Sequence, residues 1–105
     1  TMEALNKFHN LSGIVILTGG ITGAAKAVQD KGLTGKVKIV CFDYDNEVLD
    51  LIRKGVIYAA IGQDPFSQGH DPIIAMYNYL VTGEKPASVS YTRTEYIDIR
   101  SVSEE

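Results

Sequence analysis

The fold is decided by residues 36–65, which read KVKIVCFDYDNEVLDLIRKGVIYAAIGQDP. Lys36 to Phe42, which contains the mostly apolar run Val37 to Phe42, predicts a strand. Asn46 is a suitable N-cap for a short helix over Glu47–Lys54, and Val56–Ile61 predicts the next strand. A strand, a helix and a strand in this order are typical of the right-handed crossover unit of a parallel sheet.

The same alternation continues on both sides of this segment. Upstream, Ile14–Leu17 is a continuous apolar run that predicts a strand covered on both faces, and Ile21–Lys31 has its apolar residues on one helical stripe. Downstream, Asp64 as N-cap and Pro65 at the first helical position predict a long helix that runs to Thr82 and ends at a glycine. Two further segments complete the pattern: the end of a helix over Met2–His9 and one or two more exposed strands over Val89–Ile99.

Length and composition limit the architecture to one compact α/β domain. The 105 residues leave room for a single core, and three core strands are few for a parallel sheet. We therefore expect part of a larger sheet to be absent. The helix-like sequence at Thr1 supports the interpretation that the chain is a fragment of a longer protein.

Charge and reactive side chains exclude several classes of function. The formal net charge is −3 without a block of like charge, a pattern that indicates neither nucleic acid nor a membrane surface as a partner. The only cysteine, Cys41, lies inside an apolar run and is expected to be buried and inert. The two histidines, His9 and His70, have no acid and nucleophile at catalytic spacing, and no Cys/His cluster has the spacing of metal ligands. We therefore expect no catalytic residues, no metal and no cofactor.

The candidate site lies where the predicted strands end. In parallel sheets, ligands bind beyond the carboxyl ends of the strands, where this chain places Thr18-Gly19-Gly20, Asp43 and Gln63. The carboxylate of Asp43 can accept two hydroxyl hydrogen bonds at once, and the amide of Gln63 can both donate and accept. Each has a structural alternative, since Asp43 could cap the next helix and Gln63 could brace a loop.

Two other site types have to be weighed against this sequence. Residues 18–23 nearly match the dinucleotide-binding fingerprint, with Thr18 in place of the first glycine, and Asp43 lies about 20 residues further on, where a ribose-binding acid would stand. The missing glycine is the one that the tight turn needs, which counts against a nucleotide-binding enzyme half-domain. A phosphorelay receiver needs acids after its first strand, and Thr18-Gly19 stands there instead.

The order of short motifs resembles a known family. The motifs are the following: Gly23-Ala24-Ala25-Lys26-Ala27-Val28 with Gly32-Leu33, a strand that ends in Phe42-Asp43, Ile52-Arg53-Lys54-Gly55, and Gln63-Asp64-Pro65-Phe66 with Gln68-Gly69. Over nearly the whole chain they resemble the C-terminal lobe of type I periplasmic sugar-binding proteins, which LacI-type effector domains share. The resemblance implies a Rossmann-like, three-layer α/β sandwich with a parallel sheet, of which residues 1–105 form one partial lobe.

The resemblance also implies a function and a set of contacts. Asp43 and Gln63 would be the polar sugar contacts of the lobe. Thr18-Gly19-Gly20 stands where many relatives have an Asn-Asp pair, so a hydroxyl or backbone contact is expected there. The implied function is binding of a carbohydrate or related polyol by a two-lobed solute-binding protein of ABC-type transport or sensing, which closes about hinge segments near Tyr91–Glu95.

The implied partners are a sugar, the missing N-terminal lobe of the same protein, and a membrane transporter or sensor, with no nucleic acid contacted by this segment. Similar lobes begin with two further strand–helix units, so Ile14–Leu17 is expected to have a bare edge that a second copy or a helix covers. The expected location is periplasmic or that of an extracellular lipoprotein. The alternative is the effector domain of a LacI-type regulator, which would be cytoplasmic.

Overall fold

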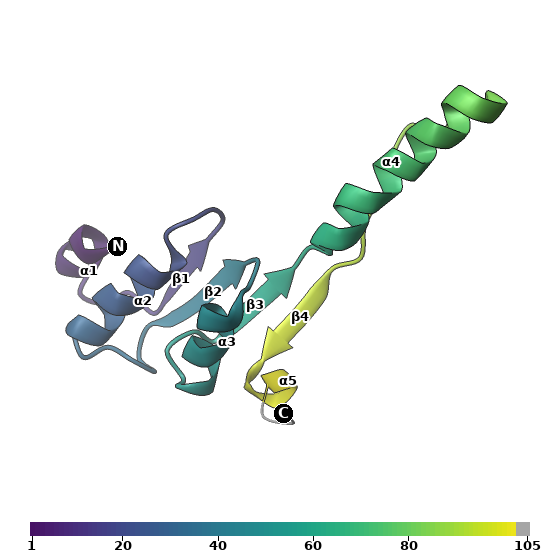
Figure 1. The fold of residues 1–105 in the computed structure, drawn as a ribbon. Helices are drawn as coiled ribbons and strands as arrows, with labels where there is room; N and C mark the ends of the chain where they lie inside the picture. The colour runs from purple at the N-terminus through teal and green to yellow at the C-terminus, as the bar shows by residue number, and fades with distance from the viewer. Residues whose placement is uncertain (103–105) are drawn as a thin grey trace. The chain divides into compact units, whose positions relative to one another are not determined.

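A computed structural model describes residues 1–102 of the chain (Figure 1). These residues form two compact units, one made of residues 1–62 with the segment that begins at Tyr96, and the other made of Gln63–Glu95. The chain therefore passes between the units twice, after Gly62 and after Glu95.

The first unit is built on a four-stranded sheet. Its strands are β1 (Gly13–Ile16), β2 (Lys38–Phe42), β3 (Ala59–Gly62) and β4 (Glu95–Asp98), in the spatial order β1-β2-β3-β4. The first three strands are parallel, with Ile14 opposite Ile39 and Cys41 opposite Ala60. Figure 1 shows that β4, the edge strand next to β3, is antiparallel to it. The predicted parallel core is confirmed, and the antiparallel edge makes the sheet mixed.

The first four helices follow the predicted order, and the short fifth helix was not predicted. They are α1 (Met2–Lys7), α2 (Ile21–Asp30), α3 (Asn46–Arg53), α4 (Pro65–Thr82) and α5 (Ile99–Val102). The predicted ends of α4 are confirmed, since Asp64 is its N-cap and Gly83 is a left-handed C-cap. The N-cap of α3 is Asp45 and not Asn46, because the Asp45 carboxylate accepts a hydrogen bond from the Val48 amide at 2.9 Å.

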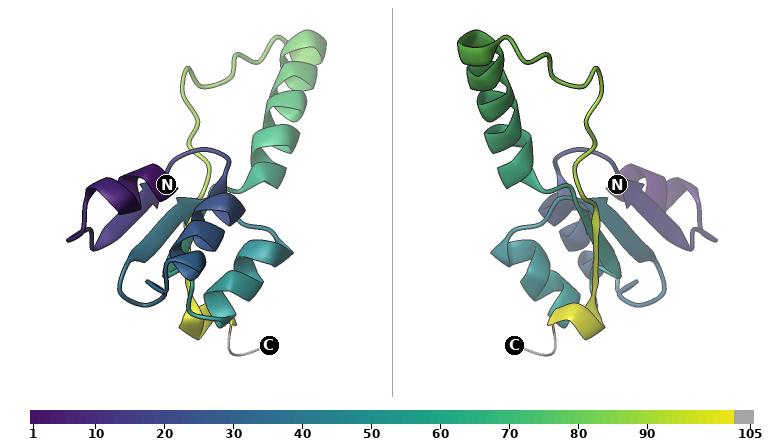
Figure 2. Two further views of the ribbon diagram at one scale, coloured as in Figure 1. Left: turned by 90° about the vertical axis from the view of Figure 1, so that its left-hand side faces the viewer. Right: turned by 90° about the vertical axis from the view of Figure 1, so that its right-hand side faces the viewer.

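The core lies between the sheet and the helices on one of its faces. Figure 2 shows α2 and α3 on the same side of the strands. The largest fully buried side chains of this unit are Ile39, Ile52, Ile57, Val28 and Cys41. They come from β2, α2, α3 and the segment before β3, and they belong to a single buried apolar cluster.

Two expectations about strands are wrong. The run at Ile14–Leu17 was expected to be covered on both faces, but Val15 is 63% exposed and Leu17 is 70% exposed. Among the described residues, helices therefore cover only the Ile14 and Ile16 side of β1. The alternating stretch at Val89–Ile99 forms a strand only over Glu95–Asp98, because Ile99 already begins α5.

The second unit consists of α4 and the segment that follows it. None of the residues of α4 is buried, although the helix carries large apolar side chains on several faces. The exposed apolar side chains of α4 are Phe66, Ile73, Ile74, Met76, Tyr77, Tyr79, Leu80 and Val81. Among residues 1–102, no helix combines the length and apolar character needed to cross a bilayer.

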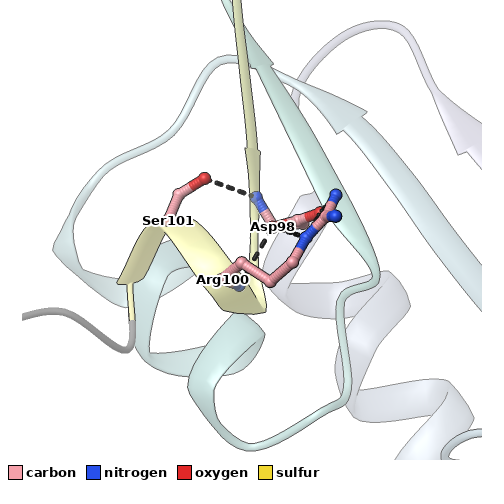
Figure 3. Close-up of polar contacts among 3 residues, drawn as sticks. All are labelled: Asp98, Arg100 and Ser101. Carbon is pink, nitrogen blue, oxygen red and sulfur yellow. Dashed lines mark hydrogen bonds and ion pairs between the residues drawn. The ribbon is translucent and has the colours of Figure 1, made fainter.

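The end of β4 is joined to α5 by a compact polar network (Figure 3). The carboxylate of Asp98, a residue only 8% exposed, accepts hydrogen bonds from the Arg100 amide at 2.9 Å and from the Arg100 guanidinium at 2.6 Å. The Ser101 hydroxyl lies 3.3 Å from the Asp98 amide, which donates to it. These bonds, above all those from the Arg100 side chain, hold the pKa of Asp98 below its usual range.

The Asp98 network predicts a pH-dependent contribution to stability. Because the pKa of Asp98 is lowered by folding, its contribution is present above the unfolded pKa of about 3.9 and is lost as the pH falls through the folded value. We expect Asp98→Asn to lower the melting temperature at pH 7, and the difference from the wild type to shrink toward pH 3. Asp50→Asn, which breaks an exposed ion pair with Arg53, is the control and should change little at either pH.

Candidate functional site

Asp43 follows β2 in a constrained backbone conformation. Its φ is 69°, in the left-handed region that non-glycine residues seldom occupy, at a cost of about 1–2 kcal/mol. Its amide donates to the Ile61 carbonyl at 2.8 Å, which extends the β2–β3 ladder by one residue. The residue is exposed. The main chain of Asp43 is therefore tied to the sheet, while the residue lies at the surface of the first unit.

The N-cap of α3 comes from a neighbour of Asp43. Because Asp45 supplies the N-cap of α3, the cap does not require Asp43. Cys41, two residues before Asp43, is fully buried as expected. Burial raises the pKa of the Cys41 thiol, and the charges of Asp43 and Asp45 raise it further. The thiol is therefore protonated at neutral pH, which suits a packing role.

Thr18, Gly19 and Gly20 form the exposed turn between β1 and α2. Gly20 is the N-cap of α2 with a φ of 90°, and it makes no side-chain cap. Since β1 and β2 are parallel neighbours, this turn and Asp43 lie beyond the same edge of the sheet. The structure thus brings these sequence-predicted residues to one edge of the first unit.

Gly23 does not have the packing role that the third glycine of a dinucleotide-binding fingerprint has. The third glycine of that fingerprint permits close packing of the helix on the strand. At Gly23, a Cβ atom would meet nothing within 4 Å. The geometry therefore gives no support to the nucleotide-binding alternative.

Because Gly20 has a positive φ and Gly19 does not, replacing each with alanine should change the free energy of unfolding by different amounts. Gly20→Ala places a Cβ at a φ of 90° in otherwise open space, so backbone strain alone should lower the free energy of unfolding by about 1–2 kcal/mol. Gly19→Ala adds the same methyl group in open space without a positive φ, and it should stay within about 0.5 kcal/mol of wild type. Urea unfolding of both variants measures the difference, and equal losses would contradict the role of the backbone at Gly20.

Gln63 is the first residue of the second unit, joined to Gly62 at the end of β3. Its main-chain carbonyl accepts hydrogen bonds from Gln68 Nε2 at 2.6 Å and from Thr92 Oγ1 at 3.1 Å. The next residue, Asp64, has a φ of 55° and caps α4 through the Ser67 amide at 3.2 Å. Hydrogen bonding with Ser67 lowers the pKa of Asp64, and the charge of Arg93 adds to this effect. The carbonyl of Gln63 thus braces this loop, and the role of its carboxamide stays a prediction.

Two clefts within the described residues have walls that include neither Asp43, nor Gln63, nor the turn at 18–20. One, of about 700 Å³, lies in the second unit between α4 and the returning segment, and its walls include Gln68, Met76, Tyr79 and Thr92. The other, of about 450 Å³, lies in the first unit beside Lys38, Tyr58, Asp98 and Arg100. The sequence analysis included Thr92 only as part of the expected hinge segment, and its hydrogen bond to the Gln63 carbonyl was not predicted.

His70 lies on the exposed surface of α4, beside Phe66 and Asp71. His70 stacks on Phe66 with ring centroids 5.2 Å apart and contacts the Asp71 carboxylate at 3.0 Å. This exposed arrangement is typical of a surface histidine on a helix. Within the described residues, no group of three His, Cys, Asp or Glu side chains is placed to share a metal ion.

Comparison with known proteins identifies the fold. The profile of the periplasmic binding protein domain matches residues 1–85. The chain is similar to GanP, a glucose–galactose binding protein from Geobacillus stearothermophilus, at 25% identity and a TM-score of 0.85, over 93% of this chain and 35% of that one. The comparison with curated proteins gave no match.

Two further solved structures are similar to the chain. The first is a XylFII–LytSN complex, at 27% identity and a TM-score of 0.82, covering 95% of this chain and 35% of the matched chain. The second is a periplasmic ribose ABC transporter from Conexibacter woesei, at 25% identity and a TM-score of 0.83, covering 98% and 35%. The chain spans about a third of the length of the solved structures that it matches.

Proposed function

Because this chain belongs to the periplasmic binding protein domain family, we propose that it supplies one side of the carbohydrate-binding cleft of a two-lobed solute-binding protein. Sugars are bound by the proteins named in two of the structural matches, a glucose–galactose binding protein and a ribose transporter. The proposed role of this chain is ligand binding without a chemical step. Its ligand class is a sugar or a related polyol.

The observation that carries this proposal is the presentation of Asp43. A constrained main chain, anchored to β3 through the Ile61 carbonyl, places an exposed aspartate at the carboxyl end of β2. A carboxylate at this position can accept hydrogen bonds from two neighbouring hydroxyl groups of a sugar. Thr18, Gly19 and Gly20 supply a hydroxyl and main-chain groups from the adjacent strand end.

Gln63 is proposed as the second polar contact. It follows the last residue of β3 directly, so it continues the series of strand ends that Thr18–Gly20 and Asp43 begin. A carboxamide can donate to one sugar oxygen and accept from another hydroxyl, which complements the acceptor-only carboxylate of Asp43.

The two passages between the units suit a hinge. The segment expected to act as a hinge, Tyr91–Glu95, ends where the chain passes from the second unit into β4, and the other passage follows Gly62. Closure of two lobes around a solute requires a few residues that absorb a change in φ and ψ while the units stay rigid. We assign this role to the residues at both passages.

The missing N-terminal lobe is the proposed partner of α4. This helix exposes Phe66 and Leu80 to 74% and 73%, and none of its residues is buried. An apolar surface of this kind is typical of an interface, and about two thirds of the matched proteins lies outside the region that this chain covers. The bare edge of β1, expected to be covered by a helix or a second copy, is proposed as a further contact.

Transport or sensing outside the cytoplasm is the proposed setting. The ribose match is named as a periplasmic ABC transporter, and XylFII was solved in a complex with LytSN. By analogy, the closed form would be recognised by a membrane transporter or a sensor. A signal peptide or lipobox upstream of Thr1 in the gene supports this setting, whereas an upstream helix-turn-helix indicates a LacI-type regulator.

The proposal is tested by titrating the two-lobed protein with a panel of pentoses, hexoses and polyols, and separately with NAD. At a ligand concentration about 100 times Kd, binding stabilises the folded state by about 2.7 kcal/mol and raises the melting temperature accordingly. We expect a rise with at least one sugar and none with NAD. A rise with NAD alone would contradict the proposal.

A further inference from the structure

A closed triangle of hydrogen bonds joins the start and the end of the second unit. The Gln63 carbonyl accepts from Thr92 Oγ1 at 3.1 Å and from Gln68 Nε2 at 2.6 Å. Gln68 Nε2 also donates to Thr92 Oγ1 at 3.3 Å. Thr92 and Gln63 are 29 residues apart in the chain, so this contact depends on tertiary structure.

Each hydrogen of the Gln68 amide and the Thr92 hydroxyl has an acceptor within this triangle. The Gln68 amide nitrogen has two hydrogens, one for the Gln63 carbonyl and one for the Thr92 oxygen. The Thr92 hydroxyl has a single hydrogen, which it donates to the Gln63 carbonyl. The two lone pairs of that carbonyl are thereby both used, and the direction of the Gln63 peptide group is determined.

The residues on either side reinforce this arrangement. Asp64 turns the chain in a left-handed conformation and is held by the Ser67 amide. Arg93, the residue after Thr92, contributes its positive charge to the environment of Asp64. The outgoing segment at 63–64 and the returning segment at 92–93 are therefore linked both by hydrogen bonds and by charge.

We propose that Thr92 and Gln68 are positioning residues, which hold the Gln63 carbonyl so that the Gln63 carboxamide is presented to the sugar. This role rests on the proposed function, because it presumes that Gln63 contacts the ligand. Neither Thr92 nor Gln68 needs to touch the sugar. Their effect is to restrict the backbone of Gln63 to fewer conformations before the sugar binds, which lowers the entropy lost on binding.

The experiment is the substitution Thr92→Val in the two-lobed protein, which removes the hydroxyl and keeps the β-branched shape. Loss of one neutral hydrogen bond of this kind should weaken sugar affinity roughly 3- to 10-fold by isothermal titration. The carbonyl ¹³C resonance of Gln63 in the sugar-free protein should move as well, since that carbonyl loses a donor. Thr92→Ser, which restores the hydroxyl, should restore both values.

The control is Thr34→Val, the same substitution at an exposed threonine of the first unit, which should change neither value. An unchanged affinity or an unchanged Gln63 carbonyl resonance in Thr92→Val would overturn the positioning role. If Asp43→Gly abolishes binding while Thr92→Val does not, only the positioning role fails. If the wild-type protein binds no sugar, the proposed function fails as well.

Discussion

Asp43→Gly is expected to weaken sugar binding by the two-lobed protein at least 100-fold without unfolding it. Hydrogen bonds to a charged group contribute about 1.5–3 kcal/mol each, so the loss of two removes roughly 3–6 kcal/mol of binding free energy. Glycine is the informative replacement, because it accepts the φ of 69° without the strain that Asp43 bears. Relief of that strain opposes the greater entropy of glycine in the unfolded chain, so the free energy of unfolding should stay within about 1 kcal/mol of wild type.

The matched control for this variant is Asp45→Asn. It removes one negative charge two residues away and keeps an oxygen that can cap α3 through the Val48 amide. Its affinity for the sugar should stay within about twofold of wild type. Titration calorimetry of both variants with the sugar that gives the largest melting shift measures the two effects. Equal losses of affinity would indicate a general effect of charge and would refute a direct contact by Asp43.

Ile39→Ala is expected to cause the largest loss of stability among single substitutions in the sheet. Ile39 is fully buried in the central strand β2, opposite Ile14 of β1, and its carbonyl accepts from the Tyr58 amide at 2.8 Å. Truncation of a fully buried isoleucine to alanine lowers the free energy of unfolding by about 2–5 kcal/mol, because the surrounding helices and strands cannot fill the cavity that remains. The expected cost here is toward the upper end, since the strand is held by neighbours on both sides.

Val15→Ala on β1 provides the contrast for Ile39→Ala. Val15 is 63% exposed, so its truncation leaves no buried cavity and should lower the free energy of unfolding by less than about 0.5 kcal/mol. Urea unfolding followed by circular dichroism measures both values. A loss at Val15 comparable to that at Ile39 would mean that a partner covers the exposed face of β1 in the two-lobed protein.

Local chemistry explains why much of the fold could be predicted from the sequence. A helix N-cap needs only a side-chain acceptor near the first turn, so Asp64 and Pro65 predicted the start of α4 correctly. At the start of α3, two adjacent residues had suitable side chains, and only the structure shows that Asp45 is the cap. Apolar runs predicted β1, β2 and β3 because burial of a strand is recorded in its own composition.

The sequence by itself determined the alternation of strands and helices, and it placed Thr18–Gly20, Asp43 and Gln63 after successive strands. The tertiary structure alone decided that β4 lies antiparallel beside β3, that one face of β1 is exposed, and that Thr92 reaches the Gln63 carbonyl. The physical reason is the difference in sequence separation over which these interactions act. Propensities, caps and periodicity act over a few residues, whereas pairing across 29 residues depends on how the intervening chain packs.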